Sequence, residues 1–364
     1  MRTSYTRPLT AFIAGAWVAT MLYGTSAVAQ TSGLPEQPAI HSAMATQSVM
    51  LSVARAGQRL VAVGERGFIL VSDDNGGHWK QVGSPVSMTL VKVRFIDANL
   101  GWAVGHAGAV LHSRDGGLTW EKQLDGVQAA RIELDQTSSE TGDGAAEHLE
   151  QARQLVEEGP DKPFLDVLFQ DARHGWVVGA YGLAFVTHDG GASWQSIRSS
   201  LDNPSGLHLY SIEQAGADVF IAGEQGVLLR SSDKGQTFEP LTSPYEGTVF
   251  GLQASAKHSL LMFGLRGKAF ESTDRGETWQ RLDTLEPVTL TSGLRLEDGS
   301  VLLADESGRV LRFADGHDKA VTVPIPQPGY FTGMAQAANG ELIISSSRGM
   351  LSSAIQVEPS EPRQ

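Results

Sequence analysis

Residues Gly101–Trp120, GWAVGHAGAVLHSRDGGLTW, contain the pattern that decides the fold. Gly105 and Gly108 enclose two residues, a short apolar run follows, and the stretch ends in the motif Ser-x-Asp-x-Gly-x-Thr-Trp. Trp120 lies twelve residues after Gly108. The same distance separates a glycine from an aromatic residue in four other places, Gly67–Trp79, Gly182–Trp194, Gly226–Phe238 and Gly267–Trp279. A motif repeated at fixed spacing indicates a repeat architecture.

Two weaker copies extend the series to seven units. The marker glycines are Gly67, Gly108, Gly182, Gly226, Gly267, Gly308 and Gly349. Successive distances are 41, 74, 44, 41, 41 and 41 residues. The units are rich in Val, Leu, Phe and Thr, in short runs bounded by glycine, which favours strands over helices. Seven such units predict an all-β chain, a seven-bladed β-propeller of four-stranded antiparallel blades.

The second unit illustrates one blade. We expect its strands at Leu90–Ile96, Trp102–Val104 and Ala109–Ser113, with a fourth beginning at Thr119. All six tryptophans after residue 29 fall at repeated positions. Because aromatic side chains of this size bury much apolar area, we expect them to pack between blades.

The last unit lacks a good fourth strand. Its first three strands are expected at Phe331–Gln336, Leu342–Ser345 and Met350–Ile355, and residues 357–364 form a polar, proline-containing tail that we expect to be disordered. We predict that Pro38–Met44 supply the missing outer strand of this blade. That strand would close the ring and leave no open edge between its first and last blades.

The distance of 74 residues indicates an insertion between blades 2 and 3, at residues 121–163. Residues 135–143 are rich in Gly, Ser, Thr and acids, which predicts a mobile loop. Residues 144–158 carry apolar side chains at helical spacing, so we expect one helix of about three turns there. This helix either rests on the propeller or binds a partner.

The N-terminus has the features of a secretory signal peptide over residues 1–29. Arg2 and Arg7 precede an apolar run, Leu9–Tyr23, and cleavage is expected after Ala29. The alternative is an uncleaved membrane anchor, for which the apolar run is short. We therefore expect a mature propeller at residues 30–356, located in the periplasm or secreted.

Composition excludes several classes of function. The chain has 28 Lys+Arg against 41 Asp+Glu and a formal net charge of -13, so it lacks the basic surface of a nucleic-acid binder. Because it has no cysteine, disulfides and thiol chemistry are excluded. The ten histidines include no pair at i, i+4, and each Gly-x-x-Gly precedes a strand rather than a helix. We expect no metal site and no cofactor.

The aspartates of the repeated motif fit turn chemistry. A carboxylate accepts nearby backbone N–H groups, and the following glycine takes positive φ at little steric cost. Calcium needs six to eight oxygen ligands, whereas most copies offer a single carboxylate. We therefore assign a structural role to these Asp-box residues, which are Asp74, Asp115, Asp189, Asp233 and Asp274.

Ser-x-Asp-x-Gly-x-Thr-Trp resembles the Asp-box repeat of bacterial neuraminidases. The longer phrase Gly-Trp-Ala-Val-Gly-x-x-Gly-x-x-Leu-x-Ser-x-Asp-Gly-Gly-x-Thr-Trp is similar to the photosystem II stability/assembly factor family, in its non-photosynthetic bacterial form. The resemblance covers Leu60–Leu282 well and the last two units weakly. It implies an exported propeller whose photosynthetic members bind a membrane subunit through an arginine patch. Relatives with an inserted helix before Asp161–Asp166 imply a periplasmic partner of a membrane protein or transporter complex in the inner membrane.

Propeller connectivity predicts which surface binds. The turns between second and third strands share one face with the connections between blades, including the insertion, and the Asp-box turns lie on the opposite face. Sequence at these second-to-third turns varies while the framework repeats, which is typical of a binding surface on a rigid scaffold. The alternative is that they are ordinary solvated turn residues. The candidate partner-binding residues are Arg66, His106, Tyr181, Glu224, Arg266 and Arg348.

Three functions compete. We favour a non-enzymatic scaffold that binds a membrane protein, with no catalytic residues and no small-molecule substrate. A sialidase-like glycosidase usually carries Arg-Ile-Pro, whereas here Arg131-Ile132 is followed by Glu133. A retaining glycosidase also needs two carboxylates about 5–5.5 Å apart, and Glu224 and Glu306 lie two blades apart. A glycan-binding module needs exposed aromatic residues on the binding face, for which only Tyr181 qualifies.

Overall fold

The computed structural model describes residues 37–355 except 143, 255–258, 315 and 317. The predicted signal peptide and the predicted C-terminal tail lie outside these residues. The described residues belong to one compact unit. Within the described part of the chain, no helix has the length and apolar character required to cross a membrane.

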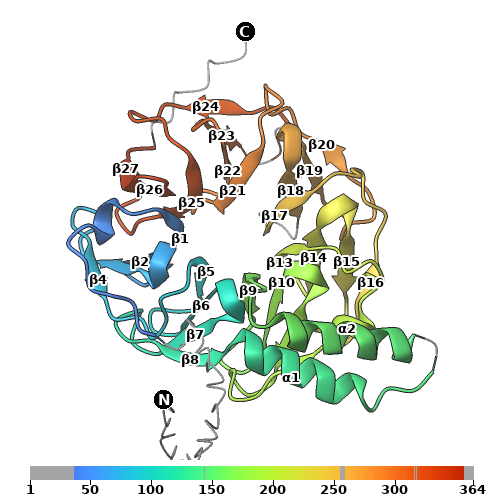
Figure 1. Cartoon of the computed structure of the whole chain (residues 1–364). Helices are drawn as coiled ribbons and strands as arrows, with labels where there is room; N and C mark the ends of the chain where they lie inside the picture. The colour runs from blue at the N-terminus through green and yellow to red at the C-terminus, as the bar shows by residue number, and fades with distance from the viewer. Residues whose placement is uncertain (1–36, 143, 255–258, 315, 317, 356–364) are drawn as a thin grey trace, which may run out of the picture. The chain divides into compact units, whose positions relative to one another are not determined.

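Seven antiparallel sheets follow one another in chain order and form a ring around a central channel (Figure 1). Within residues 37–355, as far as they are described, six sheets have four strands and the last has three. We number these sheets as blades 1–7 and call the first strand of each its inner strand. The seven-bladed propeller predicted from the repeats is therefore confirmed.

The first four blades contain these strands. Blade 1 comprises β1 (Met50–Ala56), β2 (Arg59–Gly64), β3 (Ile69–Ser72) and β4 (Lys80–Val82). Blade 2 comprises β5 (Leu90–Phe95), β6 (Gly101–Gly105), β7 (Val110–Ser113) and β8 (Glu121–Leu124). Blade 3 comprises β9 (Phe164–Phe169), β10 (Gly175–Gly179), β11 (Ala184–Thr187) and β12 (Gln195–Ser196). Blade 4 comprises β13 (Leu209–Ala215), β14 (Asp218–Gly223), β15 (Leu228–Ser231) and β16 (Glu239–Pro240).

The last three blades continue the same order. Blade 5 comprises β17 (Val249–Ala254), β18 (Leu260–Gly264), β19 (Ala269–Ser272) and β20 (Gln280–Arg281). Blade 6 comprises β21 (Leu290–Arg295), β22 (Val301–Asp305), β23 (Val310–Phe313) and β24 (Val321–Val323). Blade 7 comprises β25 (Phe331–Gln336), β26 (Leu342–Ser346) and β27 (Gly349–Ser353).

The fourth strand of blade 2 begins two residues later than the sequence predicts. The reason is that Thr119 belongs to the Asp-box turn. Its backbone N–H and its hydroxyl both donate to the Asp115 carboxylate, at 2.9 and 2.6 Å. Trp120 closes the same turn through a 3.0 Å bond from its indole N–H to the carbonyl of Gly117. Ladder pairing starts only at Glu121.

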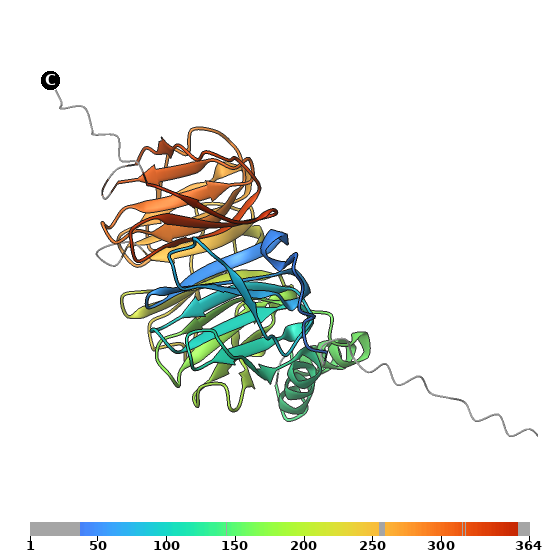
Figure 2. The same cartoon turned by 90° about the vertical axis from the view of Figure 1, so that its left-hand side faces the viewer.

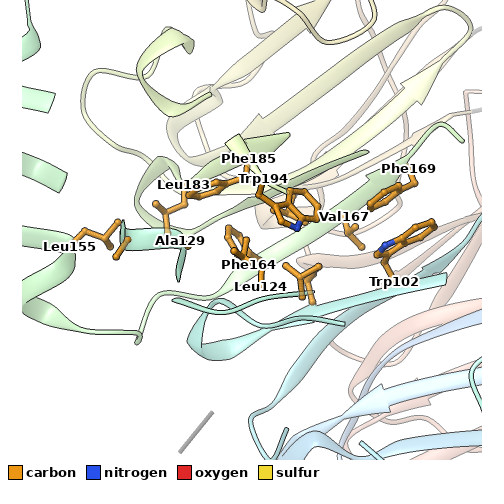
Figure 3. Packing of buried hydrophobic residues seen from close by; sticks show 14 residues of the cluster. Trp102, Leu124, Ala129, Leu155, Phe164, Val167, Phe169, Leu183, Phe185 and Trp194 are labelled. Carbon is orange, nitrogen blue, oxygen red and sulfur yellow. The ribbon is translucent and has the colours of Figure 1, made fainter. Parts of the chain in front are cut away.

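The core lies between the blades, as the repeated aromatic residues predict. Trp102 of blade 2 stacks on Phe169 of blade 3, with ring centroids 3.6 Å apart and planes 6° apart (Figure 3). Trp194 belongs to the same cluster, and Trp176 belongs to the next one, between blades 3 and 4. Burying such rings between neighbouring sheets holds each blade against the next.

The predicted closure of the ring is wrong for the described residues, because Pro38–Met44 form no strand and blade 7 has three. The Gln81 side chain instead accepts the Ser42 N–H and donates to the Ile40 carbonyl, at 2.9 and 2.8 Å. These contacts engage the backbone groups that a ladder would use. Ile40 and Met44 are 65% and 59% exposed, so the segment has no apolar face to place on blade 7.

Blades 1 and 7 close the ring by direct packing. Met50 and Leu60 of blade 1 share a buried cluster with Ala335 and Ile343 of blade 7. The Thr332 hydroxyl donates to the Met50 carbonyl across the same junction at 2.7 Å. The junction therefore resembles the other blade contacts and needs no shared sheet.

The insertion forms two helices, α1 (Gly126–Thr137) and α2 (Ala145–Glu158), where the sequence predicts only the second. It begins at Asp125, because residues 121–124 complete blade 2. Asp125 starts α1 with a capping box, in which its side chain accepts the Gln128 N–H while the Gln128 side chain accepts the Asp125 N–H. The loop predicted at residues 135–143 therefore begins only after Thr137, the last residue of α1.

The helical hairpin rests on blades 2 and 3. Ala129 of α1 and Leu155 of α2 enter the cluster that contains Phe164 and Leu183 of blade 3 (Figure 3). Gln136 donates to and accepts from the backbone of Ser196 on the outer strand β12, at 3.1 and 2.6 Å. The hairpin thus covers part of that strand's open edge, and it stands on one face of the ring (Figure 2).

Candidate functional site on the turn face

We call the surface formed by the seven turns between second and third strands the turn face. In blades 1–5 each of these turns is one 3-10 turn, and these turns are η3 (Glu65–Gly67), η4 (His106–Gly108), η5 (Ala180–Gly182), η7 (Glu224–Gly226) and η9 (Leu265–Gly267). The middle residue of each has a left-handed backbone, with φ between 51° and 57°. The turn therefore sets the direction in which the Cα–Cβ bond of this residue points.

The insertion shares this face. A Cβ placed on Gly108 of η4 would lie 2.6 Å from the Cα of Gly126, the first residue of α1. That close approach requires glycine and seats the helix beside the turn of blade 2. The hairpin therefore borders the face that carries the six candidate residues.

The structure places all six candidates at turns of this face. Five are exposed, and Glu224 is half-buried. The side chains of Arg66, Arg266 and Arg348 make no hydrogen bond or ion pair with the residues that the structure describes, and neither does that of His106. They lie on blades 1, 5, 7 and 2, so the ring keeps them apart.

Tyr181 and Glu224 are brought together by His208, which sequence reasoning missed. The Tyr181 N–H donates to the imidazole Nδ1 at 3.1 Å, and the two rings lie 4.9 Å apart. Glu224 accepts the His208 backbone N–H at 2.9 Å. Because Nδ1 accepts a hydrogen bond, it carries the lone pair in this arrangement.

These contacts continue toward the channel as a row of rings. The ring of His208 lies 6.2 Å from that of Tyr210, and Tyr210 lies 5.1 Å from Phe250. We call Tyr181, His208, Tyr210 and Phe250 the aromatic lane. At its outer end the Lys162 ammonium lies 4.9 Å from the centre of the Tyr181 ring. The lane therefore links the hairpin's last loop to blades 3, 4 and 5.

The lane ends in the central channel, which encloses about 840 Å³ and is lined by the inner strands. Tyr210, Phe250 and Tyr330 are among its lining residues. Its interior is charged, because Arg94 of blade 2 contacts Asp166 of blade 3 and Glu213 of blade 4, each at 2.8 Å. Sequence reasoning missed these residues. The signal that could have pointed to them is the pair of cationic residues at alternate positions of the predicted strand Leu90–Ile96.

The Asp-box carboxylates are fully engaged by their own turns on the opposite face. In blade 5 Asp274 accepts the hydroxyls of Thr278 and Ser272, at 2.5 and 2.8 Å, and the Thr278 N–H at 2.9 Å. Hydrogen bonds from Thr278 and then Ser272 lower the pKa of Asp274 to about 2. No group of three or more His, Asp or Glu in the described part of the chain is arranged to hold a metal ion.

Comparison with known proteins places this geometry in a family. The model of the family described as photosynthesis system II assembly factor YCF48 matches residues 71–144 and 145–361, which together make up most of the chain. The chain is 33% identical over 118 residues to the photosystem II assembly lipoprotein Ycf48 of Synechococcus sp. (strain CC9902), covering 32% of this chain and 35% of that one. It thus spans about a third of that relative's length.

A longer match extends over two thirds of another relative. The photosystem II assembly lipoprotein Ycf48 of Prochlorococcus marinus (strain MIT 9313) is 30% identical over 240 residues, covering 51% of this chain and 70% of that one. The photosystem II stability/assembly factor HCF136 of Oryza sativa subsp. japonica is 28% identical over 134 residues, covering 35% and 32% of the two chains.

Solved structures show the same fold. The structure titled YCF48 bound to D1 peptide superposes with a TM-score of 0.61 at 18% identity, covering 86% of this chain and 95% of that one. A streptogramin B lyase superposes with a TM-score of 0.64 at 10% identity, covering 84% and 93%. Because the fold is shared by an assembly factor and a lyase, the fold alone does not decide between scaffold and enzyme.

Proposed function

We propose a function for this chain from the premise that it belongs to the photosynthesis system II assembly factor YCF48 family. It is a non-enzymatic scaffold that holds a segment of a membrane protein on its turn face and so aids the assembly or activity of a membrane complex. The partner is a membrane protein or transporter complex in the inner membrane. The protein acts on the periplasmic side of that membrane, or is secreted, as the signal-like residues 1–29 suggest.

The aromatic lane is the observation that carries this proposal. Partner-binding surfaces are enriched in tyrosine and other aromatic residues, because a rigid ring offers large contact area at small entropic cost. Tyr181 is 50% exposed although it is held by a left-handed turn and by His208. A side chain fixed in this way and left open to solvent is prepared for contact with a partner.

The names of similar proteins agree with this proposal. Those reported above are called assembly factors or assembly lipoproteins. The structure that superposes over most of the ring is titled as bound to a D1 peptide. A rigid propeller with a peptide-sized aromatic row on one face suits the same kind of task.

Site-specific photocrosslinking in intact cells tests the proposal. A benzoylphenylalanine is placed at Tyr181 on the turn face or at His78, whose side chain is 94% exposed in an Asp-box turn of the opposite face. We expect a membrane protein to be captured from Tyr181 and not from His78. Equal capture from both positions, or capture of no membrane protein from Tyr181, contradicts the proposal.

A deletion tests the role of the hairpin. Only residues 126–158 should be removed and replaced by a short linker, because residues 121–124 are a strand of blade 2. If the deletion variant still captures the partner from Tyr181, the aromatic lane alone holds the partner. If capture is lost while the ring stays folded, the hairpin contributes to the same binding surface. The competing sialidase-like or glycan-binding function predicts instead that the protein binds on a glycan array, that Tyr181→Ala abolishes this binding, and that the crosslinker at position 181 captures no membrane protein.

A further inference from the structure

Hydrogen bonds between neighbouring inner strands follow a rule in three blades. The side chain of the third residue accepts the backbone N–H of the fourth residue of the next inner strand. The pairs are Ser52–Val93 at 3.2 Å, Asp166–Ile212 at 3.1 Å and Ser211–Leu252 at 3.1 Å. This position is therefore an acceptor position of the framework.

Lys92 occupies the same position in blade 2 and cannot accept a hydrogen bond, because an ammonium is only a donor. The N–H of Val167, which the rule would assign to it, is taken by Asp166 Oδ1 at 2.8 Å. Lys92 thus takes no part in the hydrogen bonding between the inner strands of blades 2 and 3. The lysine therefore departs from the pattern of the other blades, and the hydrogen bonding of the propeller gives no reason for it.

The ammonium of Lys92 also has no direct partner in the described part of the chain, neither a hydrogen bond nor a carboxylate within 4.0 Å. Asp166 and Glu213 lie nearby, but Arg94 takes them both. Burial in the ring, only partly offset by Asp166, lowers the pKa of Lys92. Lys92 is half-buried in the channel wall. An unpaired cation that is partly withdrawn from water costs stability, and such departures from local rules are expected at functional positions.

The space around Lys92 is shaped for a ligand. Lys92 lines the channel of about 840 Å³, a volume within the usual range of ligand pockets. Gly251 and Gly333 hold its position in blades 5 and 7, so no side chain at that position of these blades can pair with Lys92. The space beside these two glycines is filled by the Phe263 ring and the Ser345 hydroxyl. One residue nearer the turn face, half-buried side chains of the inner strands form a mainly apolar collar, which includes Leu51, Val91, Leu165, Tyr210 and Phe250.

We propose that the channel binds a carboxylate carried on an apolar body, with Lys92 donating to the carboxylate and the collar, chiefly Val91, Tyr210 and Phe250, enclosing the apolar part. A free organic acid and the C-terminal carboxylate of a peptide share this chemistry. The inference goes beyond the proposed scaffold function, since it places a ligand inside the ring and needs no partner on the turn face.

Calorimetric titration of the full protein tests it with matched probes. Phenylbutyrate and its neutral analogue phenylbutyramide represent the free acid. Acetyl-leucyl-leucyl-phenylalanine and its C-terminal amide represent the peptide. We expect at least one acid to bind and its amide to bind more weakly by about tenfold or more, the usual loss when a charge-assisted hydrogen bond is removed. The acid that binds identifies the source.

Variants separate a ligand role from a structural one. Lys92→Met should lose the preference for acid over amide, while its melting temperature is unchanged or higher because an unpaired, half-buried charge is removed. Lys80→Met, which changes an ammonium 61% exposed on the outer strand of blade 1, should keep the preference. Acid should also slow the acetylation of Lys92, measured by mass spectrometry, without slowing that of Lys80. Equal binding of acid and amide, binding unaffected by Lys92→Met, or no binding of either acid at millimolar concentration overturns the proposal.

Discussion

Arg94 and Asp166 join the inner strands of blades 2 and 3 through two parallel hydrogen bonds, of 3.1 and 2.8 Å. The same guanidinium reaches Glu213 of blade 4 at 2.8 Å, so one cation links three consecutive blades. Asp166 in turn accepts the Ile212 N–H and the Ser211 hydroxyl, and its side chain is 2% exposed. These contacts give the channel wall a fully paired charged centre.

Removing both partners of this pair should cost less than the sum of the two single losses. Asp166→Asn leaves the half-buried Arg94 with a weaker acceptor beside its remaining partner Glu213, and we expect a loss of about 1–3 kcal/mol in the free energy of unfolding. Arg94→Met combined with Asp166→Asn should lose less than the sum of the two single changes. Urea titration of the single and double variants measures this coupling. Additive losses would show that the pair acts as two independent contacts.

The glycine of each Asp box lies against the preceding blade, which gives a second prediction. A Cβ on Gly235 of blade 4, at φ 78°, would lie 2.2 Å from Cζ2 of Trp176 in blade 3. Gly340 also has positive φ, 89°, but nothing lies within 4 Å of its Cβ position. Gly340→Ala should therefore cost only backbone strain, about 1 kcal/mol, and Gly235→Ala should cost about 1–3 kcal/mol more from overpacking. Thermal and urea unfolding compare the two, and equal losses would exclude the contact with Trp176 as a cause.

The repeat could be predicted from sequence because one short motif determines both a turn and an interblade contact. At positions such as 235 the Asp-box residue must be glycine, and the aromatic residue after it fills the gap between blades. Because both residues are required, the distance between them is the same from repeat to repeat. The turn face followed from connectivity alone. The position of the six candidate residues on one face was therefore predictable, although their separation around the ring and the role of His208 were not.

Other features depended on packing that a single sequence does not display. Pro38–Met44 has the length of a strand, but the Gln81 side chain binds its backbone. Helix α1 was missed because its buried apolar residues are only Ala129 and Ala130, although Asp125 and Gln128 carried the spacing of a capping box. Lys92 was overlooked because its significance appears only when the third residues of all inner strands are compared in space.

Docking of the hairpin should depend on Gln136. Its amide pairs with both backbone groups of Ser196, the edge residue of blade 3. Gln136→Ala leaves that edge uncovered, and we expect faster amide hydrogen exchange in residues 126–158 and at Ser196, with the rest of the ring unchanged. Gln128→Ala, which weakens only the cap of α1, should speed exchange at the first turn of that helix and not at Ser196. Uniform exchange changes across the ring in Gln136→Ala would contradict a local docking contact.

The Asp-box carboxylates should make the propeller sensitive to acid. Hydrogen bonds from the Thr237 side chain and backbone, then from Ser231, lower the pKa of Asp233 from 3.8 to about 2, and Asp274 shifts to the same value. Because these pKa values are lower in the folded than in the unfolded chain, the unfolded chain binds more protons between them. The contribution of both carboxylates is therefore fully present above the unfolded pKa and is lost as the pH falls through the folded pKa.

The variants Asp233→Asn and Asp274→Asn test this directly. Each should be less stable than the parent near neutral pH, since an amide accepts the same hydrogen bonds without charge assistance. The difference should narrow as the pH falls from about 4 toward 2, because the parent's carboxylate is then neutralised as well. Asp202→Asn is the control, since that carboxylate is exposed and makes no hydrogen bond with the described residues. Urea titrations at a series of pH values measure the difference, and a difference that stays constant down to about pH 2 would rule out the Asp-box carboxylates as the acid-sensitive groups.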